Sequence, residues 1–214
     1  MRKDVHVGRD RMNRLTRPFE AILAIGVAGL LWALACIPII TIVPATTAMY
    51  AVMTSWTLDG PPPVWSTFWG AFKKHFWQAL GIGVILEVVA VILAVDVTFG
   101  FRAENAPLRT VVLVVAVVLT IGLAGMMVFL FPVMTTYPSP WRRTLRNSAL
   151  FAAGYVGTTL LGLGVFALAV VAIYFAPASL PVTAGLAAYV ITILTKRAFA
   201  KYAARQEAAE PATA

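Results

Sequence analysis

The stretch that decides the fold runs from Ala21 to Leu58 and reads AILAIGVAGLLWALACIPIITIVPATTAMYAVMTSWTL, without a single charged residue. A membrane-spanning helix needs about 20 apolar residues, so this stretch is too long for one span and short for two. Pro38 and Pro44 interrupt it, and proline breaks a continuous helix. We therefore predict a full span from Phe19 to Ile40, followed by a short returning helix from Pro44 to Trp56. The returning helix is either a short tilted span or a re-entrant helix.

Outward from this stretch, four more apolar segments are each long enough to cross a bilayer. They are Phe76–Thr98, Thr110–Thr136, and two within Asn147–Thr195, where Pro177 and Pro181 mark the turn. The sequence therefore predicts an all-α fold: a polytopic transmembrane helical bundle of about five full spans plus one short broken or re-entrant helix.

The composition agrees with a membrane protein and argues against other classes. Of the 214 residues, 60% are hydrophobic and 12% are charged, whereas a soluble domain is about 25% charged. The net charge of +8 does not indicate nucleic-acid binding, because the basic residues cluster at the ends of apolar runs. The one cysteine, Cys36, lies inside an apolar run and has no partner for an internal disulfide.

The basic residues also predict the orientation in the membrane, because cytoplasmic segments carry an excess of Lys and Arg. Four segments are rich in them, whereas Gly100–Arg109 holds only Arg102 and Arg109, with Glu104 between them. The four rich segments hold Arg2, Lys3, Arg9, Arg11, Arg14 and Arg17; Lys73 and Lys74; Arg142, Arg143 and Arg146; and Lys196, Arg197, Lys201 and Arg205.

These four segments lie on one side of the membrane only if the first apolar stretch goes out and comes back. Charge therefore supports the returning helix independently of length. We expect a multi-pass membrane protein with a basic cytoplasmic tail over residues 1–18, a transmembrane domain over residues 19–200, and a cytoplasmic tail over residues 201–214 whose end is disordered. The alternative is five spans with the N-terminus outside.

The segment Val64–Trp77 reads VWSTFWGAFKKHFW and repeats aromatic residues at helical spacing. We predict an amphipathic interfacial helix that leads into a span, with tryptophan rings in the headgroup layer and lysines reaching anionic lipid. The residues expected at this interface are Trp65, Trp69, Lys73, Lys74 and Trp77.

Glu87 is the most unusual residue, since it lies near the centre of a predicted span. A charge there costs about 3 kcal/mol or more, so we expect the side chain to face the bundle interior. It is either a substrate, proton or subunit contact, or a structural hydrogen bond to a neighbouring helix, for example to Thr120 or Thr158. Asp96 follows nine residues later on the opposite helix face, so the two do not form a carboxylate pair.

Motifs of enzymes are absent from the sequence. His6 and His75 are isolated, no metal-ligand spacing occurs, and there is no nucleophile signature or Walker A sequence. We therefore predict no catalytic residue, no metal and no cofactor, and we expect that the protein is not an enzyme.

The residues Ile37–Tyr50, IPIITIVPATTAMY, resemble the signature of the YesL-like (DUF624) family of bacterial membrane proteins. That family typically reads PVVTIGPATAALY after an apolar helix, and Val43 stands here in place of its usual glycine. A second block, Phe68–Phe76, resembles the family's F-x-x-F-K-x-N-F segment. Within the first block we take four residues as candidate functional residues: Pro44, Thr46, Thr47 and Tyr50.

The resemblance implies a role without implying a catalytic site. Members of the family are often encoded beside components of carbohydrate ABC transporters, which implies an accessory or regulatory partner that contacts permease subunits within the lipid bilayer. The alternative function is a stand-alone small-solute transporter or channel that uses the broken helix near Pro44 together with Glu87, because discontinuous helices often mark transport sites.

Overall fold

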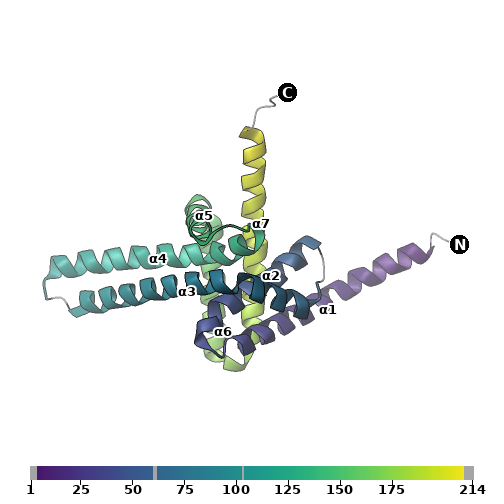
Figure 1. The fold of residues 1–214 in the computed structure, drawn as a ribbon, viewed down its shortest axis with the longest axis horizontal. Helices are drawn as coiled ribbons and strands as arrows, with labels where there is room; N and C mark the ends of the chain where they lie inside the picture. The colour runs from purple at the N-terminus through teal and green to yellow at the C-terminus, as the bar shows by residue number, and fades with distance from the viewer. Residues whose placement is uncertain (1–3, 60–61, 103, 210–214) are drawn as a thin grey trace.

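The computed structural model describes residues 4–59, 62–102 and 104–209 (Figure 1). Within these residues the backbone forms helices joined by short connections and contains no strand, which confirms the predicted all-α class. The helices are α1 (Asp4–Ala35), α2 (Ile42–Asp59), α3 (Val64–Arg102), α4 (Ala106–Thr136), α5 (Trp141–Gly154), α6 (Val156–Phe175) and α7 (Leu180–Ala209), with short 3-10 helices η1 (Ile39–Thr41) and η2 (Pro177–Ser179).

Five helical segments are long and apolar enough to cross a membrane, as expected for a multi-pass membrane protein. They are Ile39–Thr57, Val64–Arg102, Ala106–Thr136, Val156–Phe175 and Pro177–Arg205, and a shorter apolar segment covers Glu20–Ala35. At 1.5 Å per residue, the 39 residues of α3 extend about 58 Å, whereas the hydrocarbon core is about 30 Å thick. Part of α3 therefore lies outside the core or crosses it at a tilt.

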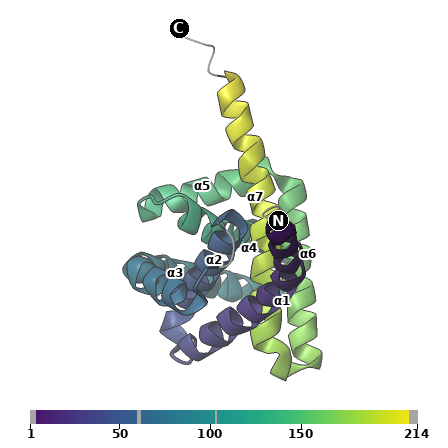
Figure 2. The same cartoon turned by 90° about the vertical axis from the view of Figure 1, so that its right-hand side faces the viewer.

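Helix α2 is the centre of the bundle and packs against α1, α3, α4 and α7 (Figures 1 and 2). In its apolar window 44% of the residues are buried, against 17% in α3 and 6% in α6. Ala45, Ala48 and Val52 are completely buried, and their small side chains allow the neighbouring helices to approach closely. The sequence around Pro38 and Pro44 therefore builds the core.

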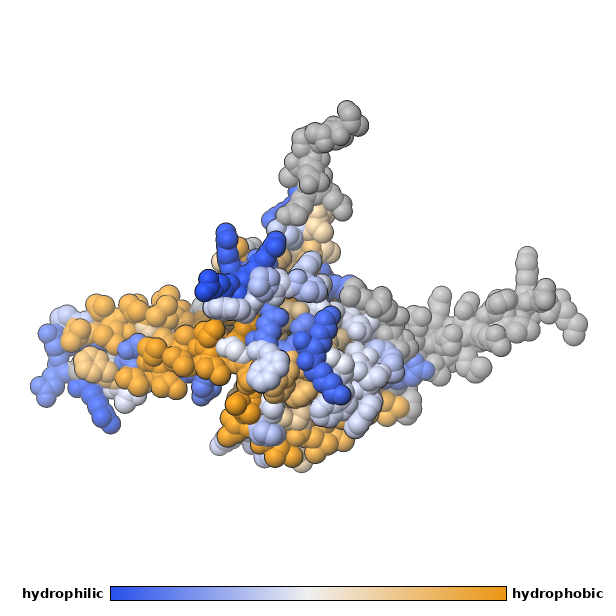
Figure 3. All heavy atoms as spheres, in the orientation of Figure 1, coloured by the Kyte–Doolittle hydropathy of each residue, from blue (hydrophilic) through white to orange (hydrophobic). Residues whose placement is uncertain are grey.

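Helices α3 and α4 form a hairpin that projects away from this core (Figure 1). We call its outer part, residues 84–102 and 106–121, the arm. Most of the large apolar side chains on the arm are exposed, because α3 and α4 have few neighbours there besides each other. Figure 3 shows the arm as an apolar surface that ends in hydrophilic residues at the tip, where Arg102, Glu104 and Arg109 are exposed.

The predicted bend near Pro38 and Pro44 in the first apolar stretch is confirmed, although the first helix ends a few residues earlier than expected. Helix α1 ends at Ala35, five residues before the predicted Ile40, and α2 begins at Ile42 with Pro44 in its first turn, a position that needs no backbone N–H. Because the chain turns earlier, the second helix gains length. It is α2, with η1, that is long enough for a span, whereas the apolar part of α1 is the shorter piece.

The structure contains one helix that hydropathy did not separate. We predicted two spans within Asn147–Thr195, but residues 147–154 belong to α5, and α6 begins only at Val156. Tyr155 leaves the helical conformation between them, with φ −123° and ψ 54°. Helix α5 buries Thr144 and Ser148 and exposes its arginines, so it is an amphipathic helix whose uncharged end resembles the start of a span.

The last turn is as predicted, with η2 beginning at Pro177 and Pro181 in the first turn of α7. The backbone of α1 runs from Asp4 without a break into its apolar part, Glu20–Ala35, and α7 continues to Ala209. Residues 210–214, where we expected a disordered end, lie outside the described residues.

Candidate functional site in the helix bundle

The signature residues predicted as functional lie in the packed core. Pro44 is buried, and the fully buried Thr47 donates its hydroxyl to the carbonyl oxygen of Val43 at 2.9 Å. Tyr50 is 2% exposed and stacks on Phe131 of α4, with ring centroids 5.3 Å apart. These side chains hold α2 against its neighbours.

Thr46 connects the two helices on either side of the bend. Its hydroxyl oxygen accepts a hydrogen bond from the Trp32 indole nitrogen of α1 at 2.9 Å and donates to the carbonyl oxygen of Ile42 at 2.7 Å. The bond joins α1 to α2 directly after they reverse direction. Thr46 thus fixes the angle of the bend, which explains a threonine at this point of the signature.

Val43, the residue that departs from the family pattern, is matched by a glycine on the neighbouring helix. A Cβ atom placed on Gly83 of α3 would lie 3.0 Å from Cγ2 of Val43, which is closer than ordinary van der Waals contact. The side chain added on one helix therefore occupies the room left by a missing side chain on the other. The α2–α3 contact is preserved although the glycine of the signature is absent.

Glu87 does not face the interior, so that prediction was wrong. Its side chain is exposed on the arm, and no hydrogen bond or ion pair joins it to the described residues. The hydroxyl of Thr120 instead donates to the carbonyl oxygen of Ala116 at 2.7 Å. Around Glu87 the surface is apolar, with Val84, Val88 and Val91 each more than half exposed.

The residues expected at the membrane interface divide between the two sides of α3. Trp65, Trp77 and both lysines of the segment are exposed, whereas Trp69 is half-buried. The completely buried Phe68 contacts the Trp69 ring edge-on, with centroids 5.5 Å apart. The inner aromatic rings anchor the start of α3 to the core, and the outer ones remain free for the headgroup layer.

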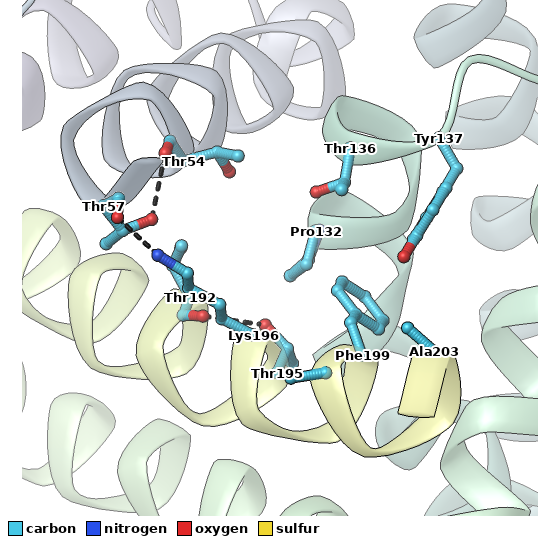
Figure 4. A pocket seen from close by; sticks show the side chains of 11 residues that line it. Thr54, Thr57, Pro132, Thr136, Tyr137, Thr192, Thr195, Lys196, Phe199 and Ala203 are labelled. Carbon is cyan, nitrogen blue, oxygen red and sulfur yellow. Dashed lines mark hydrogen bonds between the residues drawn. The ribbon is translucent and has the colours of Figure 1, made fainter. Parts of the chain in front are cut away.

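A hollow between the ends of α2 and α4 and the middle of α7 was not predicted (Figure 4). It has a volume of about 210 Å³, and we call it the threonine hollow. Its walls are formed by Thr54, Thr57, Pro132, Thr136, Tyr137, Thr192, Thr195, Lys196, Phe199, Ala200 and Ala203. The available signal was the repeat of threonines three residues apart near the ends of two apolar runs, which places hydroxyls on one face of each helix.

Most hydroxyls of the threonine hollow bond to their own helices. Thr57 donates to the carbonyl oxygen of Thr54 at 2.9 Å, and Thr195 donates to that of Ile191 at 2.8 Å. Lys196 reaches across the hollow and donates from Nζ to the carbonyl oxygen of Thr57 (Figure 4). A cation is favourable there because the last carbonyl groups of α2 carry partial negative charge.

An apolar groove of about 650 Å³ lies between the hairpin and helices α5 and α6. Small residues line much of it, among them Gly122 and Gly125 of α4 and Ala149, Ala152 and Ala153 of α5. Glu87 is not one of its lining residues, and neither are the signature residues. In the described part of the chain, no three His, Cys, Asp or Glu side chains come together in a way that suits a metal ion.

Comparisons with known proteins agree with the resemblance of the signature. A family model described as "Protein of unknown function, DUF624" matches residues 25–97, which include both signature blocks. The chain is 27% identical over 175 residues to the uncharacterized protein YteU of Bacillus subtilis, covering 79% of this chain and 76% of YteU. It is 24% identical over 208 residues to the uncharacterized protein YesL of the same organism, covering 95% and 96%. No solved structure matches the chain.

Proposed function

Since the chain is a YesL-like membrane protein of the DUF624 family, we propose that it is an accessory or regulatory partner of a carbohydrate ABC transporter in the bacterial inner membrane. Both termini lie in the cytoplasm in this proposal. The arm docks against a transmembrane helix of the permease, and Glu87 forms the specific contact. No catalytic role is included.

The observation that carries the proposal is the exposed carboxyl group of Glu87 on an apolar surface. A carboxyl group facing hydrocarbon costs several kcal/mol unless it is hydrogen-bonded or paired, and the described residues offer it neither. A neighbouring membrane helix that presents an arginine, lysine, amide or hydroxyl group at the same depth removes that cost. The isolated chain therefore lacks the partner that Glu87 requires.

The surroundings of Glu87 suit a helix of another protein. At about 100° per residue, Ala90, Ala94 and Thr98 follow Glu87 along one face of α3 at intervals of three or four residues, and all three are exposed. Small side chains allow two membrane helices to approach closely enough for polar contacts to form. This face of α3 therefore allows a second helix to approach closely and offers it one strong hydrogen-bond acceptor, the carboxyl group of Glu87.

The alternative, a stand-alone transporter or channel, receives less support from the geometry. Directly after the bend, Pro44, Ala45 and Tyr50 are buried in the packed core, and Tyr50 stacks on Phe131 of α4. Glu87 faces outward on the arm, so the broken helix and the carboxyl group do not line a shared path. A discontinuous helix marks a transport site only where its irregular backbone lines a cavity.

Co-purification from native membranes tests the proposal. The tagged chain is extracted in mild detergent and the accompanying proteins are quantified for wild type, Glu87→Leu, Glu87→Gln and the control Val95→Leu, which alters another exposed arm residue. We expect permease subunits with wild type and control. A lost hydrogen bond to a charged group is worth about 1.5–3 kcal/mol, so Glu87→Leu should reduce recovery about tenfold or more, and Glu87→Gln less.

Two results contradict parts of this proposal separately. Absence of any transporter subunit from the wild-type sample would overturn the accessory role. Equal recovery with wild type and Glu87→Leu would leave the partner but remove Glu87 as the contact. Solute flux by the purified chain alone in proteoliposomes, lost in Glu87→Gln, would instead establish the transporter.

A further inference from the structure

We propose that the threonine hollow binds an anionic oxygen group, a phosphate or a carboxylate, carried on an apolar body. The site differs in place and in residues from the arm, and it does not depend on the partner proposed above. Three donors line its wall: the ammonium group of Lys196 on α7, which lies on the side of α2, and the hydroxyl groups of Thr136 and Tyr137 at the end of α4 (Figure 4).

The three donors have unused hydrogen-bonding capacity. A lysine ammonium group carries three N–H donors, and Lys196 uses one of them on the carbonyl oxygen of Thr57. The hydroxyl groups of Thr136 and Tyr137 make no hydrogen bond to any residue that the structure describes. In Figure 4 the Thr136 hydroxyl points into the space between the three helices. A ligand rich in hydrogen-bond acceptors provides partners for such donors.

The positive charge around the hollow favours an anionic ligand over a neutral one that is equally rich in hydrogen-bond acceptors. Among the described residues that line the hollow, none is acidic and Lys196 is the one cation. Along the described part of α7 up to Arg205, the charged side chains are Lys196, Arg197, Lys201 and Arg205, all basic. The summed positive potential raises the local concentration of anions. Charge-assisted hydrogen bonds to an anion are about twice as strong as neutral ones.

The remaining residues in the wall of the hollow are apolar, so they favour a ligand that carries an apolar group next to its anionic group. Pro132, Phe199, Ala200 and Ala203 provide carbon surface, and the Phe199 ring contacts the Tyr137 ring edge-on, with centroids 5.4 Å apart. The threonines of α2 and α7 do not demand a ligand, because the hydroxyls of Thr57, Thr192 and Thr195 bond to their own helices and that of Thr54 shares a hydrogen bond with Thr135 of α4. A free inorganic ion would leave this carbon surface without contact.

Two sources supply this chemistry: a phospholipid of the leaflet, with phosphate beside acyl carbon, and a free phosphate ester in the adjoining solution. Native mass spectrometry of the protein released from nanodiscs separates them. One arm compares nanodiscs of phosphatidylglycerol with nanodiscs of phosphatidylcholine. The other adds glycerol phosphate to protein in phosphatidylcholine. The variants are Lys196→Gln and Thr136→Val, and the control is Lys201→Gln, an exposed lysine on the same helix outside the hollow.

We expect wild type and Lys201→Gln to retain phosphatidylglycerol about tenfold more than phosphatidylcholine, and Lys196→Gln and Thr136→Val to lose this preference; tenfold corresponds to about 1.4 kcal/mol. Binding of glycerol phosphate with the same dependence on these variants would identify the free ester as the source. Equal retention in all four proteins, or equal loss in Lys201→Gln, would overturn the proposal. Lys196 also bonds to the end of α2, so its substitution can disturb the fold. Tyr137→Phe therefore serves as a second variant that removes a donor. Unchanged binding in both Tyr137→Phe and Thr136→Val would also overturn the proposal.

Discussion

The central helix α2 and the arm are both apolar, yet they use their few polar groups in opposite ways. In α2 the hydroxyl groups of Thr46 and Thr47 bond within the chain, and neighbouring helices cover most of the surface. On the arm, the carboxyl group of Glu87 lies exposed among valines. A residue whose polar groups are satisfied internally builds the fold, whereas one left unsatisfied in an apolar solvent requires something outside the chain. We therefore infer that the signature residues serve the packing of the fold, whereas Glu87, which lies outside the signature, serves an interaction with another molecule.

The same glycine-to-alanine change should have opposite effects on stability in the core and next to the arm, and this is the largest effect expected. A Cβ atom on Gly29 of α1 would overlap the backbone carbonyl oxygen of Pro181 on α7, whereas nothing lies within 4 Å of one on Gly122 of α4. Gly29→Ala should cost about 3 kcal/mol or more. Gly122→Ala should be neutral or stabilise by about 0.5–1 kcal/mol. Thermal unfolding in detergent measures both.

A matched control exists on the same helix as Gly29. Gly26 also has nothing within 4 Å of an added Cβ, so Gly26→Ala should not lower the melting temperature. If Gly26→Ala and Gly29→Ala destabilise the protein equally, the close packing of α1 on α7 is not the reason that the core does not tolerate an added methyl group.

At the junction of core and arm, Val43 and Gly83 should behave as a compensating pair. Gly83→Val places new atoms against Val43 and should cost about 1–3 kcal/mol by overpacking. Val43→Gly restores the glycine typical of the family and should recover part of that loss in the double variant. The melting temperatures of the two single variants and the double variant form the cycle. Strictly additive losses would show that the two side chains do not share one space.

The bend should be the next most sensitive point. Thr46→Val keeps the shape of the side chain but removes the acceptor for the Trp32 indole, which should cost about 1–2 kcal/mol. Thr110 on the arm is exposed and bonds only to its own helix, so Thr110→Val should change stability by less than about 0.5 kcal/mol. Equal shifts in the unfolding midpoint would remove the distinction between the two regions.

Much of the fold could be predicted from the sequence because span length and proline position are local properties. The reversal between Ala35 and Ile42, the turn at Pro177 and the long apolar helices all follow from counting apolar residues between breaks. Helix α5 was missed for the same reason. Its last residues are uncharged, and counting cannot distinguish the end of a surface helix from the beginning of a span.

The candidate site was harder to predict because exposure depends on which helices become neighbours. The sequence placed Glu87 at mid-span, but its direction depends on α4 being the main neighbour of α3 in the arm. Likewise, the threonine hollow joins Thr54, Thr136 and Lys196 from three distant segments. Their shared hydroxyl chemistry is visible in the sequence, but their convergence is not.

The smallest effect expected on the isolated protein is at Glu87, and it completes the contrast between the two regions. Because the carboxyl group makes no hydrogen bond to the described residues, Glu87→Gln removes no internal contact and leaves a side chain that is less costly to expose to hydrocarbon. The melting temperature of the purified protein should therefore stay the same or rise slightly, while recovery of a partner falls. A clear drop in melting temperature would mean that Glu87 supports the fold itself, and the arm would then no longer be the region whose polar group serves a partner.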